Sequence, residues 1–128
     1  MLKSEYERLS HEILDSPLSV HKEMGPGLLE SVYQYCLVQE LRSRNIYIQE
    51  QIAVPLYYKG QILEKDFRLD LLVAEEIIIE IKAVEILLPV HQAQIISYLK
   101  LADKRLGFLI NFNVPLLKSG FRRFVNNY

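Results

Sequence analysis

Two acidic residues and a lysine interrupt apolar sequence in the stretch RLDLLVAEEIIIEIKAV, residues 68–84. Side chains of a strand alternate between its faces, so Glu80 and Lys82 share one face of the second β-forming run. If residues 74–76 form a hairpin loop, counting outward from the loop places Asp70 opposite Glu80. Opposed residues have Cβ atoms about 4.5–5.5 Å apart, and two carboxylates so close repel unless a positive charge lies between them. A divalent cation suits that gap, because Mg²⁺ prefers carboxylate and carbonyl oxygens.

The alternative is a plain surface hairpin in which Asp70, Glu80 and Lys82 point to water and form weak ion pairs. The spacing D-x9-E-x-K is short enough to arise by chance. The flanking runs, however, have the composition of strands that are buried on both faces, where a charge is costly. The stretch therefore predicts a metal site, with Lys82 beside a metal-bound water or a substrate anion.

The sequence before and after this hairpin predicts helices. Asp15 and Ser16 precede Pro17, which is typical of a helix start and divides the N-terminal region into two helices. Apolar residues recur at i, i+3 and i+4 between Leu29 and Leu41, the pattern of an amphipathic helix. The predicted helices cover residues 3–14, 16–24, 28–44, 90–102 and 116–126.

Four segments rich in branched and aromatic residues predict strands, at residues 46–60, 61–73, 77–84 and 107–112. Lys59 and Gly60 supply the turn between the first two, and Pro55 predicts an edge position or a bulge. The core order is α-β-β-β-α-β, an antiparallel meander followed by a helical crossover into a last strand. This order defines an α/β sandwich, and a glycine-rich phosphate loop is lacking.

Asp70 followed by Glu80-Ile81-Lys82 on the next strand resembles the signature of the PD-(D/E)xK nuclease superfamily, whose restriction-endonuclease-like core has this element order. Residues 27–33 read G-x-x-E-x-x-Y and resemble the small bacterial family named after that motif. The similarity runs from about Val20 to Arg123. It includes the segments VHKEMGPGLLESVY, YYKG, RLDLLV, IEIKAV, HQAQIISYLK and GFLINFN.

The resemblance implies a role for each matching residue. Asp70 and Glu80 would be the main metal ligands, joined by Glu30 directly or through water and by the backbone carbonyl of Ile81. Lys82 would orient the attacking water and stabilise charge on the phosphate. Gln94 and Tyr98, one helical turn apart, would support the site and contact nucleic acid, as in the RecB-like branch. Leu69 stands where the name of the superfamily has proline.

Without the family match, each of these residues also has a structural explanation. Glu30 is in the first turn of its helix, where the helix dipole favours an acid. Tyr33 and Tyr98 fit core packing, and Gln94 fits a helix margin. His21 and His91 are interpreted as structural and stay outside the catalytic set.

The bulk composition fits one cytoplasmic domain over residues 1–128. Cys36 is the single cysteine, which excludes an internal disulfide, and no apolar run reaches the roughly 20 residues of a membrane helix. Charge is uneven: residues 1–85 hold nine Lys/Arg against fifteen Asp/Glu, whereas residues 86–128 hold six against one. An acidic site and a basic face that includes Lys118, Arg122 and Arg123 would explain this asymmetry, as would a solvated helix surface.

Together these observations predict a phosphodiesterase that uses Mg²⁺ or Mn²⁺ to cut nucleic acid, with DNA favoured over RNA. A homodimer or a protein partner would supply DNA-binding surface, since the net charge is only −1. One alternative is a catalytically silent module that binds nucleic acid or protein. Another is a metal-dependent hydrolase of small phosphorylated molecules.

Overall fold

The chain forms a five-stranded sheet with helices on both faces, as the predicted α/β class requires. The computed structural model describes residues 1–128. Its α-helices are α1 (Lys3–Met24), α2 (Glu30–Ser43) and α3 (Pro89–Leu101). Its strands are β1 (Ile48–Tyr58), β2 (Gln61–Val73), β3 (Ile77–Lys82), β4 (Leu106–Asn111) and β5 (Phe121–Val125), and a short 3₁₀ helix, η1 (Leu117–Gly120), precedes β5.

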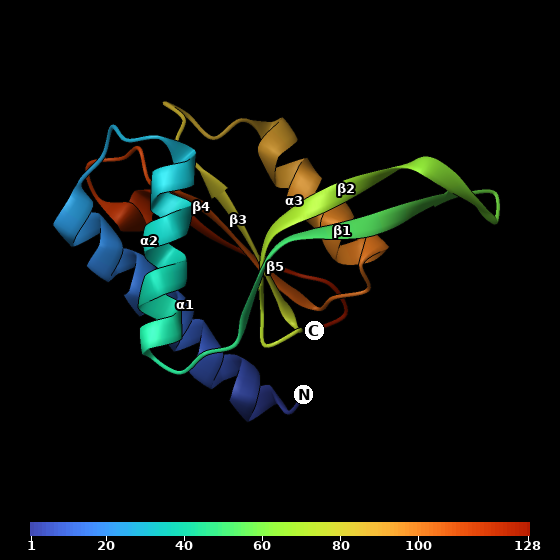
Figure 1. Ribbon diagram of the computed structural model, residues 1–128, viewed down its shortest axis with the longest axis horizontal. Coiled ribbons are helices and arrows are strands. Elements are labelled where there is room, and N and C mark those ends of the chain that lie inside the picture. Colours follow the sequence, from blue (N-terminus) through green and yellow to red (C-terminus); the bar gives the residue numbers. More distant parts are fainter.

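The strands lie in the sheet in the order β1-β2-β3-β4-β5 (Figure 1). Strands β1, β2 and β3 form an antiparallel meander. The connection through α3 then brings β4 beside β3 in parallel, because a parallel neighbour needs a crossover and not a tight turn. The predicted order α-β-β-β-α-β is therefore confirmed, and β5 adds an antiparallel strand at the end of the sheet.

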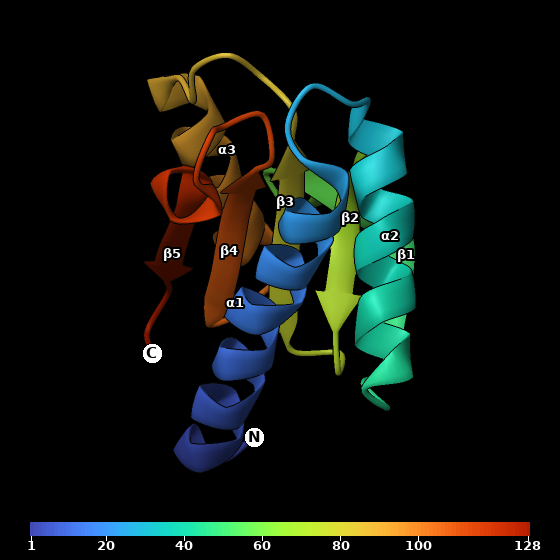
Figure 2. The same ribbon diagram turned by 90° about the vertical axis from the view of Figure 1, so that its left-hand side faces the viewer.

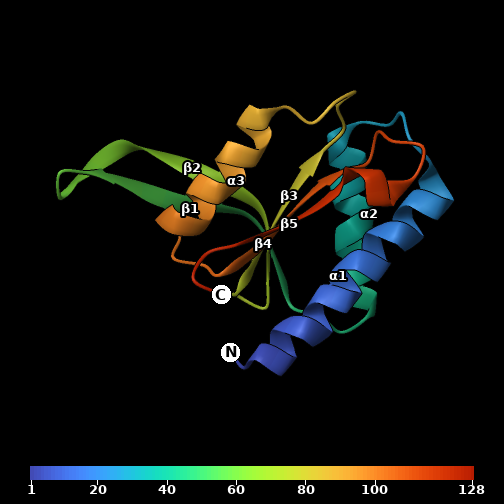
Figure 3. The same ribbon diagram turned by 180° about the vertical axis from the view of Figure 1, so that it is seen from behind.

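Helices α1 and α2 cover one face of the sheet and α3 covers the other (Figures 2 and 3). The larger core cluster joins α1 and α2 to Ile77, Ile79 and Ile81 of β3. The smaller cluster joins Ile78 to Ile95 and other residues on the α3 side. The side chains of β3 alternate between these two clusters, so Glu80 lies on the α3 face of the sheet. All other residues of β3 before Lys82 are isoleucines.

The predicted break at Pro17 is wrong, because α1 continues through this residue to Met24. The buried residues of α1 form one stripe along its whole length: Tyr6, Leu9, Ile13, Ser16, Pro17, Val20 and His21. Burying that stripe outweighs the roughly 3 kcal/mol that an internal proline costs a helix. The proline is thus accommodated by packing, and the capping pattern before it has no effect.

The predicted C-terminal helix at residues 116–126 is also wrong. Only Leu117–Gly120 are helical, and Phe121–Val125 pair with the outer edge of β4. Every residue of β4 is buried, so β5 covers a strand that would otherwise present a bare apolar edge. Gly120 permits this arrangement, since a Cβ atom there would meet the Asn111 carbonyl oxygen at 2.2 Å.

The β1–β2 hairpin extends beyond the helical layers as an arm (Figure 1). β1 is an edge strand, and the pairing register shifts between Pro55 and Tyr57, so the edge position and the bulge predicted from Pro55 are both confirmed. The predicted turn at Lys59 and Gly60 is confirmed by their positive φ angles of 51° and 79°. None of the helices combines the length and the apolarity that crossing a membrane requires.

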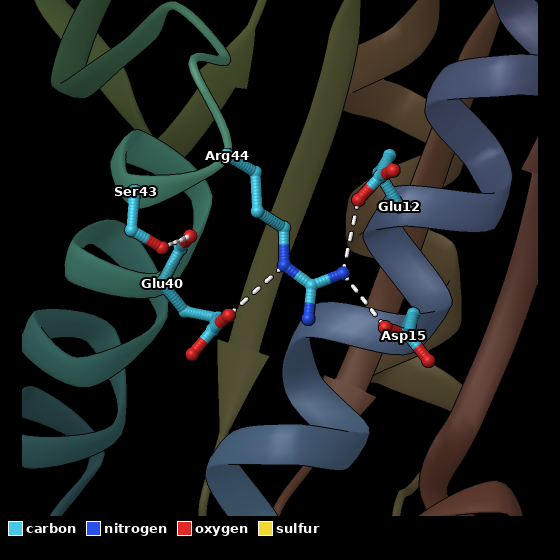
Figure 4. A network of polar contacts seen from close by, with 5 residues as sticks. All are labelled: Glu12, Asp15, Glu40, Ser43 and Arg44. Atoms are coloured by element: carbon cyan, nitrogen blue, oxygen red, sulfur yellow. Dashed lines mark hydrogen bonds and ion pairs between the residues drawn. The ribbon is translucent and has the colours of Figure 1, made fainter.

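An arginine joins the two helices of the larger layer. Arg44 follows α2 and donates through Nη1 to Glu12 at 2.9 Å and to Asp15 at 2.7 Å, both on α1 (Figure 4). Its Nε donates to Glu40 at 2.9 Å. The three carboxylates raise the pKa of Arg44, which keeps the guanidinium charged at every accessible pH.

Candidate active site

The predicted register between β2 and β3 is confirmed. Val73 pairs with Ile77, and the ladder continues to Leu71 and Ile79. The next position along would pair Asp70 with Glu80. There the side-chain carboxylates, and not backbone carbonyls, accept hydrogen bonds from the N–H groups of the neighbouring strand. The backbone N–H of Asp70 donates to Glu80 Oε2 at 2.8 Å. The N–H of Ile81 donates to Asp70 Oδ2, also at 2.8 Å.

Burial makes this carboxylate pair electrostatically costly. Glu80 is only 4% exposed, and burial together with the charge of Asp70 raises its pKa to about 8. Burial also raises the pKa of Asp70, against the effects of the Ile81 N–H, Lys82 and Gln51. Buried carboxyls placed this close to each other resist ionisation, and a nearby positive charge favours their ionised forms.

Lys82 ends β3, and its positive charge lowers the pKa of Glu80, Asp70 and Glu30. Its backbone carbonyl accepts from the N–H of Phe112 at 2.9 Å. Asn111 then holds the segment that follows, with Nδ2 donating to the Val84 carbonyl at 2.8 Å and Oδ1 accepting from the Val84 N–H at 3.0 Å. Asn111 is not among the predicted site residues, although an asparagine at the end of the apolar strand LGFLIN is a visible signal.

Glu30 reaches the same region from the first turn of α2. The charges of Lys82, Asp70 and His91 all affect its pKa, but burial has the largest effect and raises it. The backbone of Ala83 also offers its carboxylate a hydrogen bond. The acid of the helix therefore lies near the acids of the hairpin, as the resemblance implies.

Tyr33 fixes the loop that leads to Glu30. Its ring is fully buried and stacks on Phe112 with centroids 4.5 Å apart. Its hydroxyl donates to the Gly25 carbonyl at 2.5 Å and accepts from the Leu28 N–H at 3.1 Å. Core packing was the expected role of Tyr33, and the structure adds these two hydrogen bonds, which tie the loop before Glu30 to α2.

Gln94 and Tyr98 lie on one face of α3, and Gln94 is close enough to lower the pKa of Tyr98. The Tyr98 ring stacks on Phe67 of β2, with centroids 4.4 Å apart and planes at 13°. Burial raises the pKa of Tyr98, and the charges of Glu80 and Asp70 raise it further. Tyr98 thus belongs to the surroundings of the acid pair, whereas Gln94 is exposed and connects to the site through Tyr98.

Gln51 is a residue at this site that the sequence did not reveal. It lies in β1 and has a φ of 49°. Its side chain donates to Gln34 Oε1 of α2 at 3.2 Å and lies close enough to Asp70 to lower the pKa of that carboxyl. An alternating strand pattern carries no signal for such a backbone distortion.

The two histidines have structural contacts. His21 is buried, and its Nε2 lies 2.8 Å from the Val114 carbonyl oxygen. His91 accepts at Nδ1 from the Leu88 N–H at 3.0 Å, which caps the start of α3. Among the basic residues considered for a nucleic-acid face, Arg122 and Arg123 are exposed on β5, and Lys118 is exposed on η1.

The donor set fits a hard divalent cation in part. Carboxylate oxygens are the ligands that Mg²⁺ and Mn²⁺ prefer, and a bound ion would favour the ionised forms of buried Glu80 and Asp70, whose pKa values burial raises. However, no three His, Cys, Asp or Glu side chains lie close enough together to form a complete metal-binding group. Glu30 is therefore a neighbour of the pair and does not close a three-carboxylate cluster with it.

The fold and this arrangement of acids agree with the family comparison. Residues 7–124 match the model of the PD-(D/E)XK nuclease superfamily. The chain belongs to that superfamily, and the superfamily level of the predicted resemblance is confirmed. A search of curated proteins gives no match.

Among solved structures, the crystal structure of SSO0001 is similar, with a TM-score of 0.51 and 19% sequence identity. The match covers 95% of this chain and 57% of that chain. This chain therefore spans little more than half the length of its structural relative, and the likeness concerns the fold.

Proposed function

We propose that this protein is a metal-dependent nuclease that hydrolyses phosphodiester bonds of DNA, with RNA as the second candidate substrate. The superfamily supports a nuclease. The observation that carries the proposal is the buried pair formed by Glu80 and Asp70, with Lys82 beside it on the same strand. Within the superfamily we place the chain in the GxxExxY family, on the basis of Gly27, Glu30 and Tyr33.

The residues that would hold Mg²⁺ or Mn²⁺ directly are Asp70 and Glu80, with the backbone carbonyl of Ile81, and Glu30 would reach the ion through water. When bound, the ion lowers the pKa of water, polarises the phosphoryl oxygen and offsets charge in an in-line displacement. The hydrogen bonds from the Asp70 and Ile81 N–H groups fix one oxygen of each strand carboxylate. This pre-organisation removes the cost of orienting the acids during the reaction.

Lys82 orients the attacking water and stabilises the negative charge of the phosphate. The effect of Lys82 on the three acids supports this role, because its charge lowers the pKa of Glu30, Asp70 and Glu80. Tyr98, anchored on Phe67, and Gln94 line the α3 side, where they support the acids and contact the nucleic acid.

The surroundings of the acids favour an extended substrate over a small one. The five surface cavities are lined by other residues than Asp70, Glu80 and Lys82, whereas small ligands are usually held in enclosed pockets. A homodimer or a protein partner would add binding surface to a chain of net charge −1. We also propose that residues 1–128 form one domain and that the protein is cytoplasmic. These two points rest on the ordinary composition and on the lone cysteine.

The test is incubation of supercoiled plasmid, single-stranded DNA and RNA with Mg²⁺ or Mn²⁺, with and without chelator. We expect chelator-sensitive cleavage by the wild-type chain and a loss of at least about 100-fold in Glu80→Gln and in Lys82→Ala, because each removes a group that acts in the transition state. Glu7→Gln, which removes an exposed carboxylate on α1, is the matched control and should cut at the wild-type rate.

Other outcomes separate the alternatives. Retention of DNA without any cleavage would favour the catalytically silent module. Hydrolysis of a small phosphate ester without cleavage of nucleic acid would favour a metal-dependent hydrolase of small phosphorylated molecules. Equal cleavage by the wild type and Glu80→Gln would remove Glu80 from the mechanism and point to a contaminating nuclease.

A further inference from the structure

The backbone of β1 is distorted at one position within the strand. Gln51 has a φ of 49°, the left-handed region that costs free energy for every residue except glycine. Its neighbours pair regularly with β2, Glu50 with Leu71 and Ile52 with Leu69. Only the pair that would join Gln51 and Asp70 is missing between them.

The register is the same on both sides of this gap, so no inserted residue explains the distortion. Left-handed conformations at Lys59 and Ala74 occur where β-strands turn, and such turns require them. Gln51 lies inside a strand. In this register the residue opposite Gln51 is Asp70 of the acid pair.

The Gln51 side chain connects α2 to the acid pair. Its Nε2 donates to Gln34 Oε1 at 3.2 Å, and the side chain lies close enough to Asp70 to lower the pKa of that carboxyl. A glutamine amide has two N–H groups, so a donor is available for Asp70 while the other serves Gln34. The backbone carbonyl of Gln51 accepts from Arg68 Nη1 at 3.3 Å.

We infer that Gln51 is a positioning residue that holds the Asp70 carboxylate in its metal-binding orientation, and that the strained backbone of β1 is retained for this purpose. The inference rests on the proposed role of Asp70 as a metal ligand. The Ile81 N–H fixes Asp70 from β3, and Gln51 fixes it from β1. Gln34 in turn fixes the Gln51 amide, so α2 orients the acid that lies next to its own Glu30.

The decisive variant is Gln51→Gly, because glycine relieves the strain and removes the amide at once. We expect its melting temperature to equal or exceed that of the wild type, while Mn²⁺ binding to the free protein, measured by calorimetry, weakens about 10-fold or more, the usual effect of losing an outer-shell partner. A distortion without function predicts a glycine variant that is stable and binds Mn²⁺ normally, and that result would overturn the inference.

Lys59→Gly is the matched control, since it relieves a φ of 51° on the same hairpin at the far turn. It should change the Mn²⁺ affinity by less than about 2-fold. Gln34→Ala should weaken Mn²⁺ binding by a smaller factor than Gln51→Gly, and it should have no further effect in a Gln51→Gly background, since the two residues then act as one unit. If Gln51→Gly does not fold, wild-type affinity of Gln34→Ala overturns the inference and weakened binding supports it.

Asp70→Asn separates failure of this inference from failure of the proposed function. Unchanged Mn²⁺ affinity in Asp70→Asn would contradict the proposed metal site itself. Loss of binding in Asp70→Asn together with normal binding in Gln51→Gly would leave the metal site in place and remove only the role of Gln51.

Discussion

At the scale of single residues, the proposed role of Glu80 comes with a cost in folding free energy. Its carboxyl is buried beside Asp70, and its pKa is about 8 in the folded chain, against roughly 4.3 for an unperturbed glutamate. Between those two values the folded state binds a proton that the unfolded state releases. The contribution of this group to stability is therefore greatest at low pH and is lost as pH rises through about 8.

The resulting prediction concerns the metal-free protein. Its free energy of unfolding should fall by roughly 2–4 kcal/mol between about pH 5 and about pH 9 because of this one group. Glu80→Gln stays neutral at every pH and should lose most of that slope, so the variant should be more stable than the wild type at high pH. Urea unfolding in the presence of chelator measures both curves. Parallel curves for wild type and variant would contradict the assignment of the slope to Glu80.

The sequence identifies the charged residues of the site better than their neutral supports. Asp70 and Glu80 follow from strand alternation and hairpin counting, because charges in an apolar strand are conspicuous. Gln51 and Asn111 act through hydrogen bonds to the backbone or to another side chain. Their partners are distant in sequence or depend on a distorted φ angle, so no local spacing reveals them.

At the scale of elements, the arginine contact between α1 and α2 is the clearest test of how the helical layer is held. Arg44 is 23% exposed and binds three carboxylates, whereas Arg42 is 50% exposed and reaches only Glu50 among acids, at 3.7 Å. Exposed single pairs contribute little, and networks around a half-buried guanidinium contribute more.

We expect Arg44→Ala to lower the free energy of unfolding by about 1–2 kcal/mol and Arg42→Ala by less than about 0.5 kcal/mol. For a chain of this length, the first value corresponds to a fall in melting temperature of about 3–10 °C. The difference between the variants should shrink in high salt, because screening weakens exposed pairs. Equal losses in the two variants at low salt would show that the contacts of Arg44 with α1 are not stabilising.

The two wrong element predictions have one physical cause. Local signals at Pro17 and at residues 116–126 are real, but tertiary packing decides otherwise. A continuous apolar stripe keeps α1 intact, and the exposed edge of β4 takes up residues 121–125 as a strand. Short amphipathic segments fit helix and strand periodicities equally. Pairing with the edge of the sheet, which is not visible in the sequence, decides that residues 121–125 form a strand and not a helix.

At the scale of the whole molecule, the candidate site joins both layers of the sandwich. Glu30 comes from α2 on one face of the sheet, Tyr98 from α3 on the other, and the acid pair from the sheet between them. A cation bound there would act on every layer at once and would relieve the repulsion that weakens the metal-free chain. Metal binding and global stability are therefore expected to be linked.

Saturating Mn²⁺ should thus raise the melting temperature of the wild-type chain. A ligand at 100 times its dissociation constant stabilises the folded state by about 2.7 kcal/mol, which corresponds to roughly 8–13 °C for a protein of this size. The shift should be smaller near pH 6 than near pH 8.5, because protons compete with the ion for Glu80, whose pKa is about 8. Scanning fluorimetry at matched ionic strength measures it, with chelator and Glu80→Gln as controls. Equal shifts in wild type and Glu80→Gln would mean that the ion binds elsewhere, since the buried carboxyl of Glu80, whose ionised form a bound cation would stabilise, would then have no part in binding it.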